Sequence, residues 1–158
     1  MAVSGDEFRK ALGHLAAGVS VVTTQLPSGS FAGITVTSFT SLSLSPPLVL
    51  VCIDKRAGLH DQLAIGQAFA VNLLAAHQEH VSRRFASSAG DQFAEMPHRP
   101  GSTGAPILEG ALAAIECRVV ERHAGGDHTI VVGQVEATHI GNGDPLLHWR
   151  GKYGRIVQ

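Results

Sequence analysis

The chain has 158 residues, of which 44% are hydrophobic and 16% charged, and its formal net charge is −1. This composition indicates a globular protein, which we expect to form one domain over residues 1–158. A chain of this length buries enough surface to fold without a disulfide or a metal ion. The near-neutral charge gives no electrostatic case for nucleic acid or an anionic membrane, so we expect neither as a partner.

Features that the sequence lacks indicate its cellular location. The first residues contain no signal-peptide apolar region, and no apolar run approaches the ~20 residues of a membrane span. The two cysteines, Cys52 and Cys117, lie in apolar runs and form no CxxC pair, as is typical of reduced, buried thiols. We therefore expect a cytoplasmic protein.

An N-terminal helix comes first among the predicted elements. Ser4 and Glu7 match a capping box, and apolar residues follow at helical spacing as far as Leu15. Further along, β-branched and apolar runs between turn residues predict strands at 19–24, from about 31, and at 48–53, 69–74, 112–120, 128–140 and 146–150.

Two more helices are expected, a short one over 57–64 and a longer one over 77–85. They are separated from the last strands by a loop over 86–105, whose length is typical of functional or mobile segments. Because most strands follow one another through turns, the sequence favours an antiparallel sheet or barrel with peripheral helices.

Hydroxyl side chains are concentrated in residues 35–45, directly before an apolar strand. Seven of these eleven residues are Ser or Thr, and no charge occurs from Gly33 to Ile53. Buried hydroxyls need hydrogen-bonding partners, which a polar ligand rich in oxygens and ring nitrogens would supply. The alternative is a strand face whose hydroxyls lie in water, and the composition does not decide between the two.

Other candidate sites each have a plain structural explanation. His77 and His80 are spaced for one helix face, but a solvent-facing pair explains them better than a metal site. Arg83 and Arg84 fit either a helix C-terminus or a ligand phosphate. In Gly126-Asp127-His128-Thr129, the histidine follows a turn at the start of a strand, where sites often lie, although most such histidines are simply exposed. We expect no metal centre.

Several common catalytic motifs are absent from the sequence. There is no G-x-G-x-x-G or G-x-x-x-x-G-K-[ST] nucleotide cradle, no G-x-S-x-G nucleophile elbow and no H-E-x-x-H metal motif.

Taken together and in order, the motifs resemble those of the short flavin reductases, the reductase components of two-component flavin-dependent monooxygenases. The matching segments cover nearly the whole chain and are residues 8–11, 17–24, 33–39, 41–43, 46–49, 70–74, 84–86 and 126–128. The resemblance implies a mainly β fold, the antiparallel Greek-key split β-barrel of the FMN-binding type. It also implies a homodimer and NADH or NADPH as the reductant.

The family pattern also implies roles for individual residues. His128 would lie near the flavin ring and the nicotinamide as the catalytic residue. The cofactor-binding residues would be Thr35, Val36, Thr37, Ser38, Ser43, Asp54, Lys55, Arg56, Arg84, Phe85, Ala86 and Tyr153. Val36 departs from the pattern, since relatives often have Ala there, and a bulkier side chain could alter how the flavin is seated.

The function that the resemblance implies is an NAD(P)H:flavin oxidoreductase that reduces FMN or FAD and releases it to a separate monooxygenase. The missing catalytic motifs agree with this, because hydride transfer between two cofactors needs orientation and no protein nucleophile. The alternative is a non-catalytic flavin or haem carrier on the same barrel.

Overall fold

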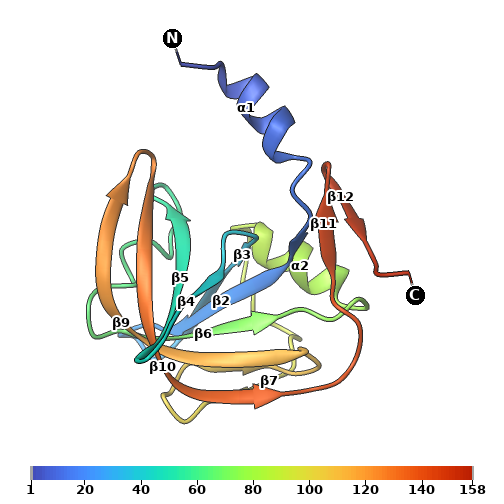
Figure 1. Ribbon diagram of the computed structural model, residues 1–158. Coiled ribbons are helices and arrows are strands. Elements are labelled where there is room, and N and C mark those ends of the chain that lie inside the picture. The colour runs from blue at the N-terminus through green and yellow to red at the C-terminus, as the bar shows by residue number, and fades with distance from the viewer. Residues whose placement is uncertain (1, 158) are drawn as a thin grey trace.

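The computed structural model describes residues 2–157 and consists mainly of antiparallel β-strands with two helices (Figure 1). The helices are α1 (Gly5–Leu12) and α2 (Glu79–Ala86). The strands are β1 (Ala17–Gly18), β2 (Ser20–Gln25), β3 (Phe31–Val36), β4 (Thr40–Leu44), β5 (Pro47–Asp54), β6 (Ala68–Leu73), β7 (His98–Pro100), β8 (Pro106–Leu108), β9 (Ala113–Gly125), β10 (His128–Ile140), β11 (Leu147–Trp149) and β12 (Lys152–Gly154).

The main sheet has seven strands in the order β3-β2-β6-β9-β10-β5-β4, and every neighbouring pair is antiparallel. The predicted antiparallel β class is therefore confirmed. The long hairpin of β9 and β10 lies at the centre of this order. No helix within residues 2–157 has the length and apolarity that crossing a membrane requires.

A short connection forces this sheet to curl. β3 and β4 are the two ends of the hydrogen-bonded order, yet only residues 37–39 join them. Four Cα–Cα steps span at most roughly 14 Å, whereas six strand spacings in a flat sheet span roughly 29 Å. Curling brings side chains from five strands around one apolar core, represented by Val22, Val51, Phe69, Val119 and Val131.

Helix α2 covers the outer side of β3. Val81, Ser82 and Phe85 are its buried residues. A Cβ added to Gly33 of β3 would lie 2.7 Å from the Phe85 ring, so the helix packs closely only because this strand position has no side chain. The sequence-predicted helix over 77–85 is confirmed with slightly later bounds.

Helix α1 begins as predicted, and within residues 2–157 none of its side chains is buried. Both halves of its capping box are formed, with Ser4 Oγ accepting from the Glu7 main-chain N–H and the Glu7 carboxylate accepting from Ser4 N–H. The helix projects from the body of the molecule (Figure 1) and contains no buried residue. Phe8 is 57% exposed and Leu15 is 66% exposed.

The predicted helix over 57–64 is wrong, because the structure forms consecutive turns there. Leu59 and Leu63 are both buried, but each reaches the core from a segment that is not helical. The segment also bonds to distant residues: Lys55 N–H donates to Asp127 O at 3.0 Å, and His60 contacts Thr129. These contacts outweigh local helix propensity, which is a weak determinant over eight residues.

A fully buried carboxylate anchors the loop before β8. The side chain of Glu116 accepts hydrogen bonds from the main chain and hydroxyls of Ser102 and Thr103, and His139 Nε2 donates to it at 2.7 Å. Burial by itself raises the pKa of a carboxyl, but here the hydrogen bonds outweigh it and lower the pKa of Glu116 to about 2.

We predict that this cradle makes stability depend on acid pH. The folded pKa lies below the ordinary value of 4.5, so the stabilisation, roughly 3 kcal/mol, is complete above that value and is lost as pH falls towards 2. In urea unfolding from pH 7 to pH 3, Glu116→Gln should have a lower free energy of unfolding than wild type at neutral pH. This difference in free energy should narrow as the pH falls. Glu109→Gln, at an exposed position, is the control; a gap that stays constant with pH contradicts the prediction.

Candidate functional site

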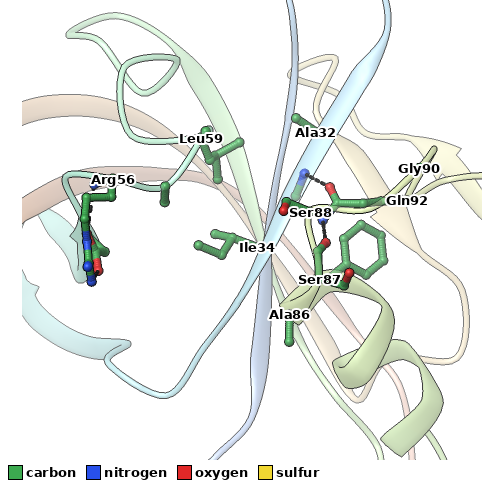
Figure 2. A pocket seen from close by; sticks show the side chains of 14 residues that line it. Ala32, Ile34, Arg56, Leu59, Ala86, Ser87, Ser88, Gly90 and Gln92 are labelled. Carbon is green, nitrogen blue, oxygen red and sulfur yellow. Dashed lines mark hydrogen bonds and ion pairs between the residues drawn. The ribbon is translucent and has the colours of Figure 1, made fainter.

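A pocket of ≈ 570 Å³ opens between β3, the turns after β5 and the segment that ends α2. Strand β3 runs through its middle, with the turns after β5 on one side and the C-terminal end of α2 on the other (Figure 2). The lining residues are Ala32, Gly33, Ile34, Asp54, Arg56, Ala57, Gly58, Leu59, Phe85, Ala86, Ser87, Ser88, Gly90 and Gln92.

The β3 edge in this pocket has main-chain groups that no strand pairs. Strand β3 bonds only to β2, and Gly33 N–H donates instead to Gln92 Oε1 at 3.3 Å. Main-chain groups alternate in direction along an antiparallel strand, so those of Thr35 point the same way as those of Gly33. Beside the pocket, the N–H of Thr35 and the C=O groups of Gly33 and Thr35 therefore have no strand partner on this edge.

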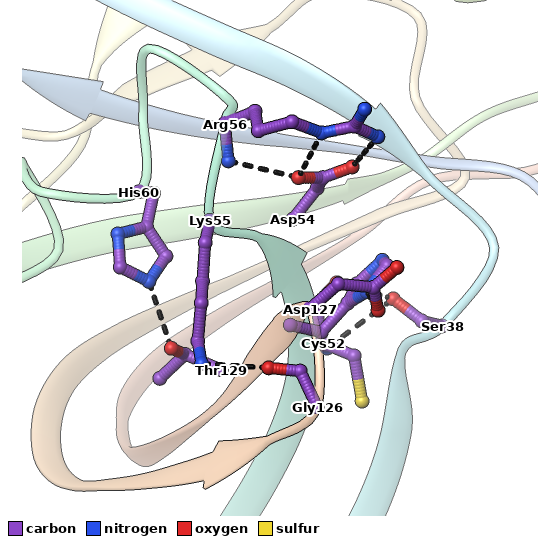
Figure 3. Close-up of polar contacts among 10 residues, drawn as sticks. Ser38, Cys52, Asp54, Lys55, Arg56, His60, Gly126, Asp127 and Thr129 are labelled. Carbon is purple, nitrogen blue, oxygen red and sulfur yellow. Dashed lines mark hydrogen bonds and ion pairs between the residues drawn. The ribbon is translucent and has the colours of Figure 1, made fainter.

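Two hydroxyls of the Ser/Thr-rich stretch are already bonded within the protein. Ser38 Oγ donates to Cys52 O at 2.8 Å and accepts from Cys52 N–H at 3.2 Å, so it pins the link between β3 and β4 onto β5 (Figure 3). Thr35 Oγ1 donates to Ser82 O in α2 at 2.7 Å. These two side chains therefore connect β3 to α2 and the β3–β4 link to β5.

An ion pair forms the charged side of the pocket. The Arg56 guanidinium contacts both carboxylate oxygens of Asp54, at 2.8 and 3.1 Å, and Arg56 N–H donates to the same carboxylate. The side-chain hydrogen bonds from Arg56 are the largest cause that lowers the pKa of Asp54. Because the guanidinium is exposed to solvent, it can also face an anionic group of a ligand.

His128 lies at the rim next to this ion pair. It is the first residue of β10 and stands directly opposite Asp54 of β5 in the strand register. Its Nδ1 is 2.7 Å from Asp127 Oδ1, and the side chain is 42% exposed. This hydrogen bond is the largest cause that lowers the pKa of Asp127. The same contact holds the His128 ring at the start of β10.

The structure brings together some of the predicted site residues and separates others. Asp54, Arg56, Phe85 and Ala86 line the pocket. Thr35, Val36, Thr37, Ser38, Lys55 and Arg84 lie close to lining residues along the chain. His128 pairs with the lining residue Asp54 across the sheet. Two residues stand apart from the lining.

These two are Ser43 and Tyr153. Ser43 pairs with Leu48, near the end of β5 remote from Asp54. The Tyr153 hydroxyl is 2.8 Å from Ser82 Oγ on α2. Their roles, like those of the other site residues, stay predictions.

Sequence reasoning missed the apolar wall and, although it marked the loop over 86–105 as typical of functional segments, named no site residue in 87–92. Ala32, Ile34 and Leu59 have side chains typical of any core, so nothing marks them as site residues. The loop had a signal: a run of small and polar residues, 87–92, directly follows Phe85 and Ala86. Gln92 closes this loop, since its Nε2 donates to Ser87 O at 2.8 Å while its Oε1 accepts from β3.

Comparison with known proteins assigns the family. The model of the flavin reductase-like domain matches residues 12–157. The chain belongs to this family. It is 38% identical over 151 residues to the reductase component of 4-nitrophenol 4-monooxygenase/4-nitrocatechol 2-monooxygenase from Rhodococcus opacus, covering 96% of this chain and 80% of that one. It is 41% identical to the FMN reductase (NADH) SmoA of Agrobacterium fabrum, covering 94% and 84%.

A solved structure supports the same relationship. The NADH:FAD oxidoreductase of Streptomyces globisporus, in complex with NAD and FAD fragments, superposes with a TM-score of 0.91 at 37% identity. The match covers 99% of this chain and 97% of that one. Recognition of the family from its sequence motifs is thereby confirmed.

We predict that Ser38→Ala destabilises the protein by about 1–3 kcal/mol. The Ser38 hydroxyl bonds both the N–H and the C=O of Cys52, and its removal leaves these partly buried groups without that partner. Ser41→Ala, exposed on the neighbouring strand, should change the free energy of unfolding little. Equal unfolding midpoints in urea for the two variants would show that Ser38 does not pin the link.

Proposed function

We propose that this protein is an NADH-dependent flavin reductase that supplies reduced flavin to a separate monooxygenase. The relatives named as reductase components and as NADH-dependent flavin reductases support this function. The observation in this structure that carries it is the unpaired edge of β3 along a pocket large enough for a flavin ring. FMN and FAD both remain candidate substrates, since the relatives include FMN and FAD enzymes.

The lining residues fit a flavin chemically. A flavin ring has an apolar portion and a pyrimidine portion with carbonyl oxygens and a ring N–H. Ile34 and Leu59 offer an apolar surface, and the Gly33–Thr35 edge offers main-chain partners. Arg56 and the small residues 86–90 would lie towards the ribityl-phosphate portion. We propose the binding residues predicted from the family pattern on this basis.

Bound nicotinamide and flavin themselves supply the hydride chemistry. The contribution of the chain is to orient the two rings and to keep water from the space between them. His128, which contacts Asp127 and pairs with Asp54, would orient the nicotinamide and is not required as a proton acceptor.

The proposal is tested by steady-state oxidation of NADH or NADPH with added FMN or FAD. We predict turnover with at least one flavin and a preference for NADH over NADPH. Tight flavin binding without NAD(P)H oxidation in any of the four pairings would favour the non-catalytic carrier instead. Absence of both binding and turnover would remove the pocket from consideration as a flavin site.

For His128→Ala we predict a partial loss, about 10- to 100-fold in kcat/KM for NADH, with flavin affinity and folding largely kept. The reason is that loss of an orienting side chain displaces the reacting atoms without removing a chemical step. His123→Ala is the matched control, because His123 pairs with Glu121 on the same hairpin away from the pocket. Stopped-flow reduction rates equal to wild type would leave His128 without a catalytic role.

We further propose a homodimer, supported by the apolar side chains that this chain leaves exposed. Helix α1 buries none of its residues, and Phe8, Leu12 and Leu15 each lie about half or more in solvent. Light scattering at micromolar concentration should give twice the chain mass of 16.5 kDa. A mass of one chain would contradict this assembly.

A further inference from the structure

The turns that form one wall of the pocket are tied to the β9–β10 hairpin (Figure 3). Lys55 N–H donates to Asp127 O at 3.0 Å, and Lys55 Nζ donates to Gly126 O at 2.6 Å. A third tie comes from His60, whose Nε2 is 2.7 Å from Thr129 Oγ1. Between these ties lie Arg56 and Leu59, which both line the pocket.

The partners of His60 determine its tautomer. Nδ1 lies 2.8 Å from Asp61 Oδ1, and a carboxylate only accepts, so Nδ1 carries the proton. Arg122 Nη2 lies 3.2 Å from Nε2, and a guanidinium only donates, so Nε2 is the acceptor. Thr129 Oγ1–H must therefore donate to the same Nε2, and the threonine hydroxyl has a definite direction.

Burial shows that this contact belongs to the interior of the fold. The His60 side chain is 13% exposed and Thr129 is 7% exposed, whereas His128 beside it is 42% exposed. Arg122 also donates to the His60 carbonyl at 3.2 Å, so both main chain and side chain of residue 60 are held. The neighbouring Leu59, only 4% exposed, thus receives its place in the wall from a polar anchor one residue later.

We infer that His60, through its hydrogen bond with Thr129, is a positioning residue for the flavin-binding wall formed by residues 56–59. The inference rests on the proposed function. His60 and Thr129 are absent from the pocket lining, so they act through Arg56 and Leu59. The turns contain no helix or strand of their own, so ties to the hairpin add to the burial of Leu59 in holding their geometry.

The test compares Thr129→Val, which removes only the hydroxyl donor at nearly constant shape, with Thr129→Ser, which retains it. FMN and FAD affinity is measured by fluorescence titration, and kcat and KM for flavin by steady-state NADH oxidation. Thr129→Val should raise Kd and KM for flavin about 3- to 10-fold, the equivalent of one hydrogen bond, while kcat at saturating flavin stays within about twofold. Thr129→Ser should restore the wild-type values.

Two further variants keep the test decisive. His60→Leu should weaken flavin binding as Thr129→Val does, and it decides the matter if Thr129→Val does not fold. The double variant His60→Leu/Thr129→Val should bind flavin as tightly as the weaker-binding single variant, because both substitutions remove the same contact. His123→Leu, which removes a solvent-facing histidine of the same hairpin, should bind flavin like wild type.

The outcomes separate this inference from the function on which it rests. A wild-type protein that neither binds nor reduces flavin overturns the proposed function. A functional wild type whose Thr129→Val and His60→Leu variants melt earlier but keep the flavin Kd shows that the contact stabilises the fold without positioning the wall. Equal weakening in Thr129→Ser and Thr129→Val also overturns the inference, because the hydroxyl would not be the cause.

Discussion

The three-residue link between β3 and β4 is the constraint on which the rest of the structure depends. It joins strands at opposite ends of a seven-stranded order, so the sheet has to curl until its ends approach each other. Ser38 fixes the link by bonding both main-chain groups of Cys52. The sheet does not pair β3 with β4, and the opening that remains between β3 and the turns after β5 is the pocket.

This arrangement gives a chain without a common nucleotide-binding motif a pocket that we propose as its cofactor site. An unpaired strand edge is usually a liability, because its free main-chain groups invite pairing with another chain. Here the edge at Gly33 is covered by Phe85 of α2 and by Gln92. Gly33 also lines the pocket, where a planar ring with donors and acceptors can complement the strand edge.

The sequence predicted the architecture well and the site in part, for physical reasons. The Ser4–Glu7 capping box and the strand-forming apolar runs depend on residues that are close together in the sequence, so the sequence alone predicts them. Of the residues that the family motifs imply, Asp54 and Phe85 line the pocket, whereas the Ser38 hydroxyl bonds to the main chain of β5.

The failures arise from contacts between distant residues. The segment 57–64 has helical spacing but forms turns, because Lys55 and His60 bond to the hairpin about 70 residues later. Nothing in the sequence around His60 or around Thr129 predicts that these two side chains form a hydrogen bond. Similarly, Ile34 and Leu59 become site residues only because the curled sheet brings them to the same opening.

Hydrogen–deuterium exchange with and without flavin tests the central claim most directly, because it reports on main-chain N–H groups. If flavin binds the open edge of β3, its addition should slow exchange in residues 31–39, 54–60 and 85–92. A second pocket of ≈ 310 Å³, lined by Gln67 and Arg118 among others, serves as the internal control and should show no change. Protection confined to that second pocket, with residues 31–39 unaffected, would contradict the account.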